Sequence, residues 1–109
     1  IMNKGIYQVF WTQTAQQDLR KIITYIAADS KTHARKIYSA IKQKANNLQQ
    51  MPLQGRIVPE LNYYGILTYR DLIYQPWLII YRIEDNKVWV LAVIDSRRNV
   101  EDILLDRFI

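Results

Sequence analysis

Apolar residues recur every three or four positions through the first half of the chain, and this spacing predicts two amphipathic helices. Thr12 or Thr14 can cap the first helix, and Thr14 with Gln17 has the spacing of a capping box. Asp29-Ser30 breaks the pattern, and Ser30 can cap the second helix. So short a break predicts an antiparallel helical hairpin, and both apolar stripes need a sheet to cover them. The stripes are Ala15, Leu19, Ile22, Ile23 and Ile26, then Ala34, Ile37, Tyr38, Ile41, Ala45 and Leu48.

Short runs of β-branched and aromatic residues predict strands on either side of this hairpin. The runs are Ile6–Trp11, Ile66–Tyr74, Trp77–Ile83 and Val88–Ile94. Pro52, Gly55 and Pro59 predict a loop over 49–62, and Asp85-Asn86 suits a tight hairpin turn. The last three runs therefore predict an antiparallel meander. Because the final run is apolar at nearly every position, we expect it to be covered on both faces.

A third and shorter helical pattern ends the chain. Asn99 can cap it, and Glu101 and Asp102 stand in its first turn, where carboxylates favour the helix dipole. The whole order predicts an α+β fold with an N-terminal strand, an antiparallel helical hairpin packed on a small, mainly antiparallel β-meander, and a short C-terminal helix. We expect one domain over residues 2–109, because this length is too small for two cores. The last helix would bury Ile103, Leu104, Leu105 and Phe108.

Several common chemistries are excluded by composition. The absence of cysteine excludes disulfides and thiol nucleophiles, and the three glycines are isolated, so there is no phosphate-binding loop. The single histidine, His33, cannot form a histidine metal cluster, and we favour an exposed helix position for it over a general base. The apolar runs, of about seven residues, are far shorter than the roughly 20 that span a bilayer. We expect no metal, no cofactor, no membrane partner and a cytoplasmic location.

The net charge of +5 is unevenly distributed along the chain. Residues 1–56 carry nine Lys and Arg against two Asp, giving +7, whereas residues 57–109 carry six against eight, giving −2. Lys31, Arg35 and Lys42 line one flank of the second predicted helix. A basic helical half attracts a polyanion or an acidic protein segment. A solvated helix surface is the simpler interpretation, and we favour it over nucleic-acid binding.

Arginines are frequent in and beside the predicted meander, where neighbouring strands could bring them together. They are Arg70, Arg82, Arg97 and Arg98. Clustered guanidinium groups bind phosphate or carboxylate through paired hydrogen bonds, and nearby tyrosines can stack on bases. The alternative, which stays open, is that these arginines pair with neighbouring carboxylates, as Asp95 would beside Arg97. The tyrosines are Tyr63, Tyr64, Tyr69 and Tyr74.

Three motifs in the meander resemble the conserved strands of ParE-like toxins. They are Tyr-Arg-Asp-Leu at 69–72, Ile-Ile-Tyr-Arg-Ile at 79–83 and Ile-Asp-Ser-Arg-Arg at 94–98. The strand, helix, helix, loop and meander order, which spans nearly the whole chain, is similar to that of the RelE/ParE superfamily of bacterial toxins. This resemblance implies a toxin of a type II toxin–antitoxin pair. Its partner would be a cognate antitoxin, acidic and partly disordered, that neutralises it in a hetero-oligomer.

The superfamily has two branches, and the residues favour one of them. The RelE branch cleaves mRNA in the ribosomal A site with sheet-borne Lys and Arg and a C-terminal Tyr. Of that set, only Arg98 matches, because the sheet arginine position falls on Leu78 and the tyrosine position on Leu104. A leucine can neither take a proton nor hold a phosphate. The resemblance therefore implies the ParE branch, which inhibits DNA gyrase by binding it, with no catalytic residue.

We expect two contact surfaces. The target would contact Arg70, Arg82, Arg97, Arg98, Arg107 and Phe108. The antitoxin would dock along the basic hairpin at Lys31, Arg35 and Lys42. Two alternatives stay open, namely a RelE-like ribosome-dependent mRNA endonuclease with a rearranged residue set, and a non-toxic homologue that acts only as antitoxin partner and co-repressor. Direct binding of nucleic acid by the chain alone is disfavoured, since no recognition-helix motif is present.

Overall fold

The computed structural model describes residues 6–109, so positions 2–5 of the predicted domain lie outside the described residues. Three helices and four strands match the predicted order, and shorter elements connect them. In chain order the elements are β1 (Gln8–Trp11), α1 (Gln13–Ala27), α2 (Lys31–Asn46), the 3₁₀ turn η1 (Asn47–Gln49), β2 (Arg56–Ile57), α3 (Pro59–Asn62), β3 (Tyr69–Tyr74), β4 (Trp77–Glu84), β5 (Lys87–Asp95) and α4 (Val100–Phe108). None of the helices in residues 6–109 is long and apolar enough to cross a membrane.

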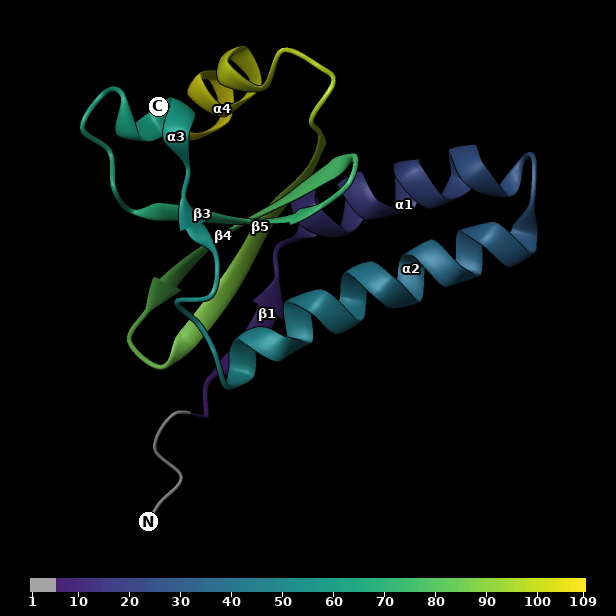
Figure 1. Ribbon diagram of the computed structural model, residues 1–109, viewed down its shortest axis with the longest axis horizontal. Helices are drawn as coiled ribbons and strands as arrows, with labels where there is room; N and C mark the ends of the chain where they lie inside the picture. Colours follow the sequence, from purple (N-terminus) through teal and green to yellow (C-terminus); the bar gives the residue numbers. More distant parts are fainter. Residues whose placement is uncertain (1–5) are drawn as a thin grey trace.

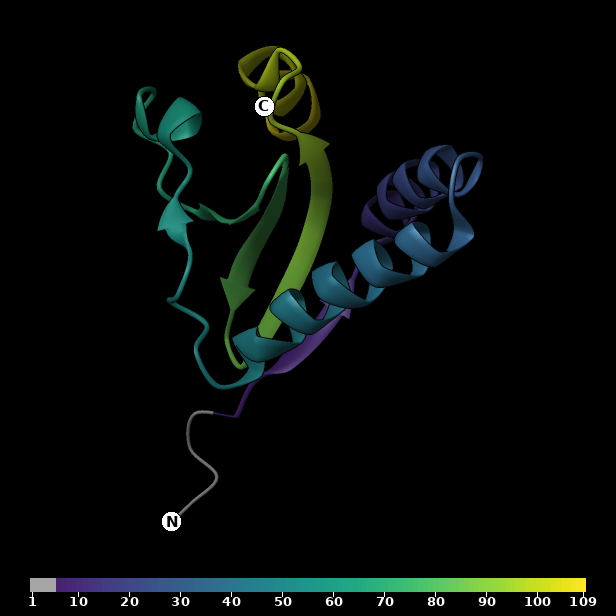
Figure 2. The same ribbon diagram turned by 45° about the vertical axis from the view of Figure 1, so that its right-hand side comes forward.

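The strands form one five-stranded sheet in the order β1-β5-β4-β3-β2. All neighbours are antiparallel except β1 and β5, which are parallel. The helices α1 and α2 lie side by side across one face of the sheet, and α3 and α4 lie together at one end of the molecule (Figures 1 and 2). The predicted α+β architecture is therefore confirmed, with a parallel edge strand added to the antiparallel meander.

Each face of the sheet has its own hydrophobic core. The helical hairpin covers the first core, in which Leu19 and Ile41 pack with Tyr81 and Val90. The second core lies on the opposite face under α3 and α4. Its buried residues are Val58, Leu61, Leu78, Ile80, Ala92, Ile94, Val100 and Leu104.

A β-bulge explains the unbroken apolar run of β5. The register shifts between Ile80 and Tyr81, whose partners are Ala92 and Val90, so Leu91 is the extra residue. Before the bulge Val90 faces the first core, and beyond it Ala92 faces the second. The strand therefore contributes buried side chains to both cores, as expected, although Trp89 and Leu91 are partly exposed.

The helix caps are mostly those that the sequence indicates. Thr12 accepts a hydrogen bond from the Ala15 amide, Ser30 from the His33 amide and Asn99 from the Asp102 amide. The predicted capping box at Thr14 and Gln17 is wrong, because both residues lie inside α1 and Thr12 already caps it.

Two predicted boundaries are also wrong. The segment 49–62 is not only a loop, because it holds β2 and the single turn α3. Pro59 supplies the first residue of α3, a position that needs no backbone N–H. The predicted strand from residue 66 begins instead at Tyr69, since the preceding residues turn around Gly65, which has a φ of +79°.

Candidate functional site

The open part of the second sheet face carries a row of side chains that crosses four strands. Phe10 of β1 pairs with Trp89 of β5, Trp89 with Arg82 of β4, and Arg82 with Tyr69 of β3. Phe10 and Trp89 stack with ring centroids 4.9 Å apart, and Tyr69 stacks on Phe108 of α4 at the same distance. We call Phe10, Trp89, Arg82 and Tyr69 the aromatic row. All four residues are partly exposed.

Arg82 is the only charged member of this row. Its guanidinium carbon lies 6.0 Å from the centre of the Tyr69 ring, at the edge of cation–π range. Its Nε is buried and has no hydrogen-bond partner within residues 6–109, and no carboxylate there forms an ion pair with it. The row thus combines aromatic rings with a cation that forms no ion pair within residues 6–109.

Arg107 does not extend towards solvent as a free contact residue, because it forms a paired ion bridge with Asp18. Its Nη1 and Nη2 lie 2.8 and 3.1 Å from the two carboxylate oxygens of Asp18, and the hydrogen bond raises the pKa of Arg107. Asp18 also accepts a hydrogen bond from the Val93 amide at 3.0 Å. One carboxylate therefore ties α1, β5 and α4 together.

The end of β5 carries the other two C-terminal arginines. Arg97 bonds Asp95 through Nη2 at 2.6 Å and Nε at 2.9 Å, which lowers the pKa of the Asp95 carboxyl. The expected ion pair at this strand end is therefore present. Arg98 is exposed, and with Lys21 and Arg107 it lines a hollow of about 130 Å³ between α1 and α4.

Arg70 serves the β2–β3 edge. Its Nη1 donates to the Gly55 carbonyl at 2.7 Å, while the neighbouring Asp71, only 1% exposed, is held by Arg56 at 2.9 Å. The Tyr81 hydroxyl completes this network, since it accepts from the Gly55 amide and donates to the Pro52 carbonyl. Burial raises the pKa of Tyr81. These groups hold the connection from α2 to β3 against the sheet.

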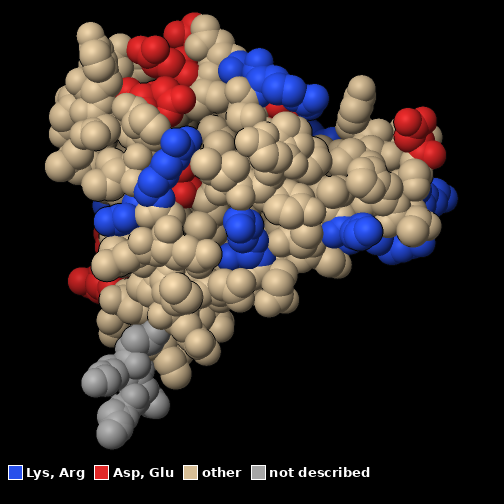
Figure 3. Space-filling view, in the orientation of Figure 1, with Lys and Arg blue, Asp and Glu red and all other residues tan. Residues whose placement is uncertain are grey.

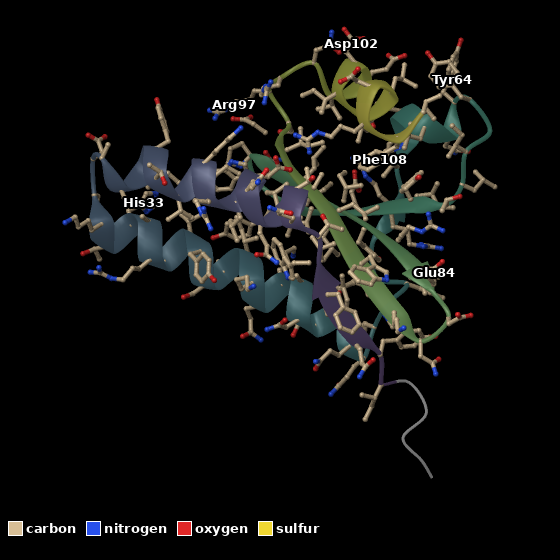
Figure 4. The ribbon with its side chains drawn as sticks, turned by 180° about the vertical axis from the view of Figure 1, so that it is seen from behind. His33, Tyr64, Glu84, Arg97, Asp102 and Phe108 are labelled. Atoms are coloured by element: carbon tan, nitrogen blue, oxygen red, sulfur yellow. The ribbon has the colours of Figure 1, made fainter. Side chains whose placement is uncertain are left out.

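The idea that the meander brings its four arginines together is wrong. Arg70 pairs with Tyr81 and Arg82 with Tyr69, so Arg70 and Arg82 point to opposite faces of the sheet. Arg97 and Arg98 follow the end of β5, whereas Arg82 lies near the β4–β5 turn. The distance between the two ends is visible in Figure 4, where Arg97 and Glu84 mark them. Of the predicted target-contact residues, Arg98 and Arg107 line one hollow together, and Arg107 and Phe108 line another.

The four tyrosines are equally dispersed. Tyr69 belongs to the aromatic row, Tyr74 packs against the first core, and Tyr63 and Tyr64 follow α3. Tyr64 donates to Glu101 at 2.6 Å, which raises its pKa and links α3 to α4. Sequence analysis missed Phe10 and Trp89. No local signal could have found them, because their contact depends on the pairing of two strands from opposite ends of the chain.

The predicted antitoxin residues lie on α2, but they differ in surroundings. Lys31 and Arg35 are exposed, whereas the Lys42 ammonium lies 4.5 Å from the Trp11 ring centre. Lys42, Trp11 and Tyr38 are among the residues that line a groove of about 280 Å³ between α1 and α2. Basic side chains follow this helical hairpin, whereas acidic ones gather over α3 and α4 (Figure 3). The groove combines aromatic walls with a basic rim.

Two positions singled out in the sequence analysis, Leu78 and Leu104, are buried. Leu78 is 5% exposed and Leu104 is fully buried, and both belong to the second core. Neither can carry a proton or a charge to a substrate. His33 lies at the far end of the hairpin, away from the sheet (Figure 4). Within residues 6–109, no group of three or more acidic or histidine side chains could hold a metal ion.

Comparison with known proteins gives a family and a fold. A family model described as the ParE toxin of the type II toxin–antitoxin system parDE matches residues 9–100. No curated protein matches the sequence significantly.

Two solved structures show the same fold at low sequence identity. One is described as a chromosomal ParDE toxin–antitoxin system from P. aeruginosa, with 22% identity, a TM-score of 0.69, and coverage of 84% of this chain and 98% of that one. The other is the toxin–antitoxin complex RelBE2 from Mycobacterium tuberculosis, with 24% identity, a TM-score of 0.62, and coverage of 85% and 94%. Both likenesses agree with the strand order and helical hairpin described above.

Proposed function

The chain belongs to the ParE toxin family of type II toxin–antitoxin systems, and on that premise we propose that it inhibits DNA gyrase by binding the enzyme and that a cognate antitoxin neutralises it. Gyrase acts in the cytoplasm, so the proposal places the toxin there. The observation that carries the choice of target is the burial of Leu78 and Leu104 in the second core. The resemblance aligns these leucines with the charged and phenolic groups of the mRNA-cleaving branch.

A binding mechanism needs accessible anchors rather than a proton relay. General acid–base catalysis requires a titratable side chain within hydrogen-bond reach of the reacting group. The second sheet face presents instead the aromatic row and Arg82. Trp, Tyr and Arg are the residues that most often dominate binding energy at protein interfaces. This chemistry supports association with a protein target.

Purified gyrase and a ribosome programmed with mRNA test the proposal side by side. We expect the protein to abolish DNA supercoiling by gyrase and to leave the mRNA intact. Cut mRNA with normal supercoiling would overturn the proposal in favour of the endonuclease. An effect on neither assay, with normal growth on expression, would instead indicate a non-toxic homologue.

The antitoxin is proposed to dock in the groove of the helical hairpin. Lys42 beside Trp11 offers a cation next to an apolar wall, and Lys31 and Arg35 continue the same flank of α2. An acidic segment with apolar side chains complements this surface, in the manner of a helix laid in a groove. Both structural neighbours are described as toxin–antitoxin systems, which supports a partner of this kind.

Charge reversal tests this docking site. We expect Lys31→Glu, Arg35→Glu and Lys42→Glu together to weaken antitoxin affinity by about 100-fold or more, because three attractive contacts become repulsive. A matched control reverses Lys36, Lys44 and Lys87, which changes the net charge equally but leaves that flank of α2 intact. Equal affinity of the two triple variants would show that only net charge, and not this surface, attracts the antitoxin.

A further inference from the structure

The aromatic row contains two large apolar side chains that lie outside both hydrophobic cores. Phe10 and Trp89 stack on each other, yet neither is part of the two hydrophobic cores or of the partly buried residues packed against them. Both rings are partly exposed on the open part of the sheet, where another molecule can reach them.

Arg82 gives this surface a charge preference. Its Nε is buried without a partner in the described chain, and a buried donor that lacks an acceptor destabilises the free protein. No carboxylate of residues 6–109 lies within ion-pair distance of its guanidinium. A carboxylate from a bound partner would supply the counter-charge by pairing with the terminal guanidinium nitrogens, because Nε itself is buried. The row is therefore complementary to an acidic group.

A hollow beside the row gives a place for a side chain of the partner. It has a volume of about 370 Å³; Leu91 and Phe108 form its apolar wall, and the rest of its lining is polar or charged, namely Thr12, Thr14, Gln17, Asp18, Lys21 and Arg107. Phe108 stacks on Tyr69 of the row, so the hollow and the row are continuous. A central apolar anchor beside a desolvated charge is the usual composition of a protein–protein hot spot.

We propose that this toxin binds its protein target through the aromatic row. The target supplies a segment with one carboxylate, which pairs with Arg82, and one apolar side chain, which packs on Leu91 and Phe108 in the neighbouring hollow. The inference rests on the proposed function, since it assumes a toxin that acts by binding. It places the target on the open sheet face and against the start of α1, which supplies part of the wall of the hollow, whereas the antitoxin groove is lined by other residues of α1 and by α2. Target and antitoxin thus have separate primary surfaces.

Substitutions in the row, each with a matched control elsewhere, test the inference. Arg82→Gln removes the charge, with Lys36→Gln on the exposed side of α2 as control, and Trp89→Leu removes the ring, with the 83% exposed Tyr25→Leu as control. Growth is measured after induction without antitoxin, and gyrase binding is measured with the purified proteins. We expect both row variants to lose growth arrest and both controls to act as the wild type. The affinity of each row variant for gyrase should fall by at least about 30-fold, which corresponds to about 2 kcal/mol of binding free energy.

Thermal melting separates loss of contact from loss of fold. If the melting temperature of Trp89→Leu is well below that of the wild type, the result for Arg82→Gln is used to test the binding role of the row, because this variant keeps the aromatic stack. If the wild type is toxic and the row variants are equally toxic, this inference is overturned and the proposed function is left intact. A wild type that neither arrests growth nor binds gyrase would overturn both. If the wild type arrests growth without affecting gyrase, the growth assay alone tests the aromatic row: variants that still arrest growth would overturn the inference.

A nucleic-acid ligand is the competing occupant, because aromatic rings beside an arginine also bind single strands. Fluorescence anisotropy with a labelled single-stranded RNA distinguishes the two. We expect no binding at micromolar protein. Tight RNA binding by the wild type that Trp89→Leu abolishes would overturn a protein target for the row.

Discussion

Tyr81 shows how one buried polar atom can organise a long connection. The side chain is fully buried, and its hydroxyl bonds both the Gly55 amide at 2.9 Å and the Pro52 carbonyl at 2.7 Å. The segment between η1 and β2 has little regular structure of its own, so these two bonds fix its path across the sheet. Gly55 is needed there for a steric reason, because a Cβ at this position would lie 2.6 Å from the Asp71 carbonyl oxygen.

Removal of the Tyr81 hydroxyl tests this role. We expect Tyr81→Phe to lower the free energy of unfolding by about 1–3 kcal/mol, since two buried backbone groups lose their partner. Urea denaturation measures the change, with the exposed Tyr25→Phe as control. A loss below about 0.5 kcal/mol, the usual range for surface substitutions, would show that the segment finds other partners.

The same hydroxyl predicts a dependence on alkaline pH. Burial raises the pKa of Tyr81 above its ordinary value of 10.0, so the folded state favours the neutral phenol. The stability from this group is therefore complete below about pH 10 and is lost as the pH rises through the higher folded value. We expect the stability difference between wild type and Tyr81→Phe to shrink from pH 9 to pH 11.5. A constant difference over that range would contradict the assignment.

Substitution of Gly55 and of Gly65 is expected to strain the fold for different reasons, a steric clash at the first and an unfavourable backbone conformation at the second. We expect Gly55→Ala to destabilise the fold by about 2 kcal/mol or more, because the new Cβ meets backbone that cannot move freely. Gly65→Ala meets nothing within 4 Å, and its cost of about 1 kcal/mol comes only from the positive φ of 79°. Urea denaturation of both variants measures the difference. A smaller loss for Gly55→Ala than for Gly65→Ala would show that the β2 segment is not held as described.

Among the elements, α4 is held both by apolar packing and by one ion pair. Val100 and Leu104 are buried in the second core, and Arg107 reaches back to Asp18 on α1. The Asp18 side chain is 10% exposed and also accepts from the Val93 amide. Charge-assisted hydrogen bonds at a partly buried site are stronger than surface ion pairs. Asp18 should therefore decide how α4 is positioned.

A double-mutant cycle measures this link between elements. We expect Asp18→Ala to cost about 2 kcal/mol and Arg107→Ala about 1 kcal/mol, because the first also leaves the Val93 amide without its acceptor. The two effects should be non-additive by about 0.5 kcal/mol or more. Asp106→Ala, an exposed neighbour on α4, is the control. Additive effects at Asp18 and Arg107 would show that the ion pair contributes nothing to the fold.

Local patterns predicted most elements, because helices and hairpins are set by nearby residues. Periodicity located α1 and α2, and Thr12, Ser30 and Asn99 cap their helices. The predicted tight turn at Asp85 is present, with a φ of 57° at that residue. The parallel pairing of β1 with β5 could not be predicted in this way, since it joins opposite ends of the chain. The bulge at Leu91 also lies outside any local signal, because it depends on the partner strand.

The same limit applies to the candidate site. Arg82 and Phe108 could be selected from the sequence as a basic and an aromatic residue in or near the family motifs. Their partners Phe10 and Trp89 could not, because alternation within one strand does not tell which residue stands opposite in the next. The proposed cluster of arginines failed for a related reason. Adjacent positions on paired strands point to opposite faces, which separates Arg70 from Arg82.

At the scale of the whole molecule, the sheet separates two surfaces of different character. The hairpin side carries the basic groove at Lys42, and the opposite side carries the aromatic row. An antitoxin that docks only on the hairpin leaves the row uncovered. The longest extent of the molecule is 45 Å, so about 14 extended residues would reach from one end to the other. An extended antitoxin segment of about 14 residues can therefore reach both surfaces.

A protein that inhibits by binding differs from a catalyst in stoichiometry. A binder of gyrase loses effect once its concentration falls below that of the enzyme, whereas a nuclease acts at a small fraction of its substrate's concentration. The titration curve therefore reports the mechanism directly. It requires neither the antitoxin nor any assumption about which residues touch the target.

The most direct test of the account is the supercoiling activity of a fixed amount of purified gyrase titrated with this protein. We predict that supercoiling falls in proportion to the added protein and is lost at a molar ratio of the order of one toxin per gyrase subunit, because the inhibitor acts by occupying a site. Full supercoiling at a large molar excess of folded protein would contradict the central claim that this ParE family member acts on gyrase by binding.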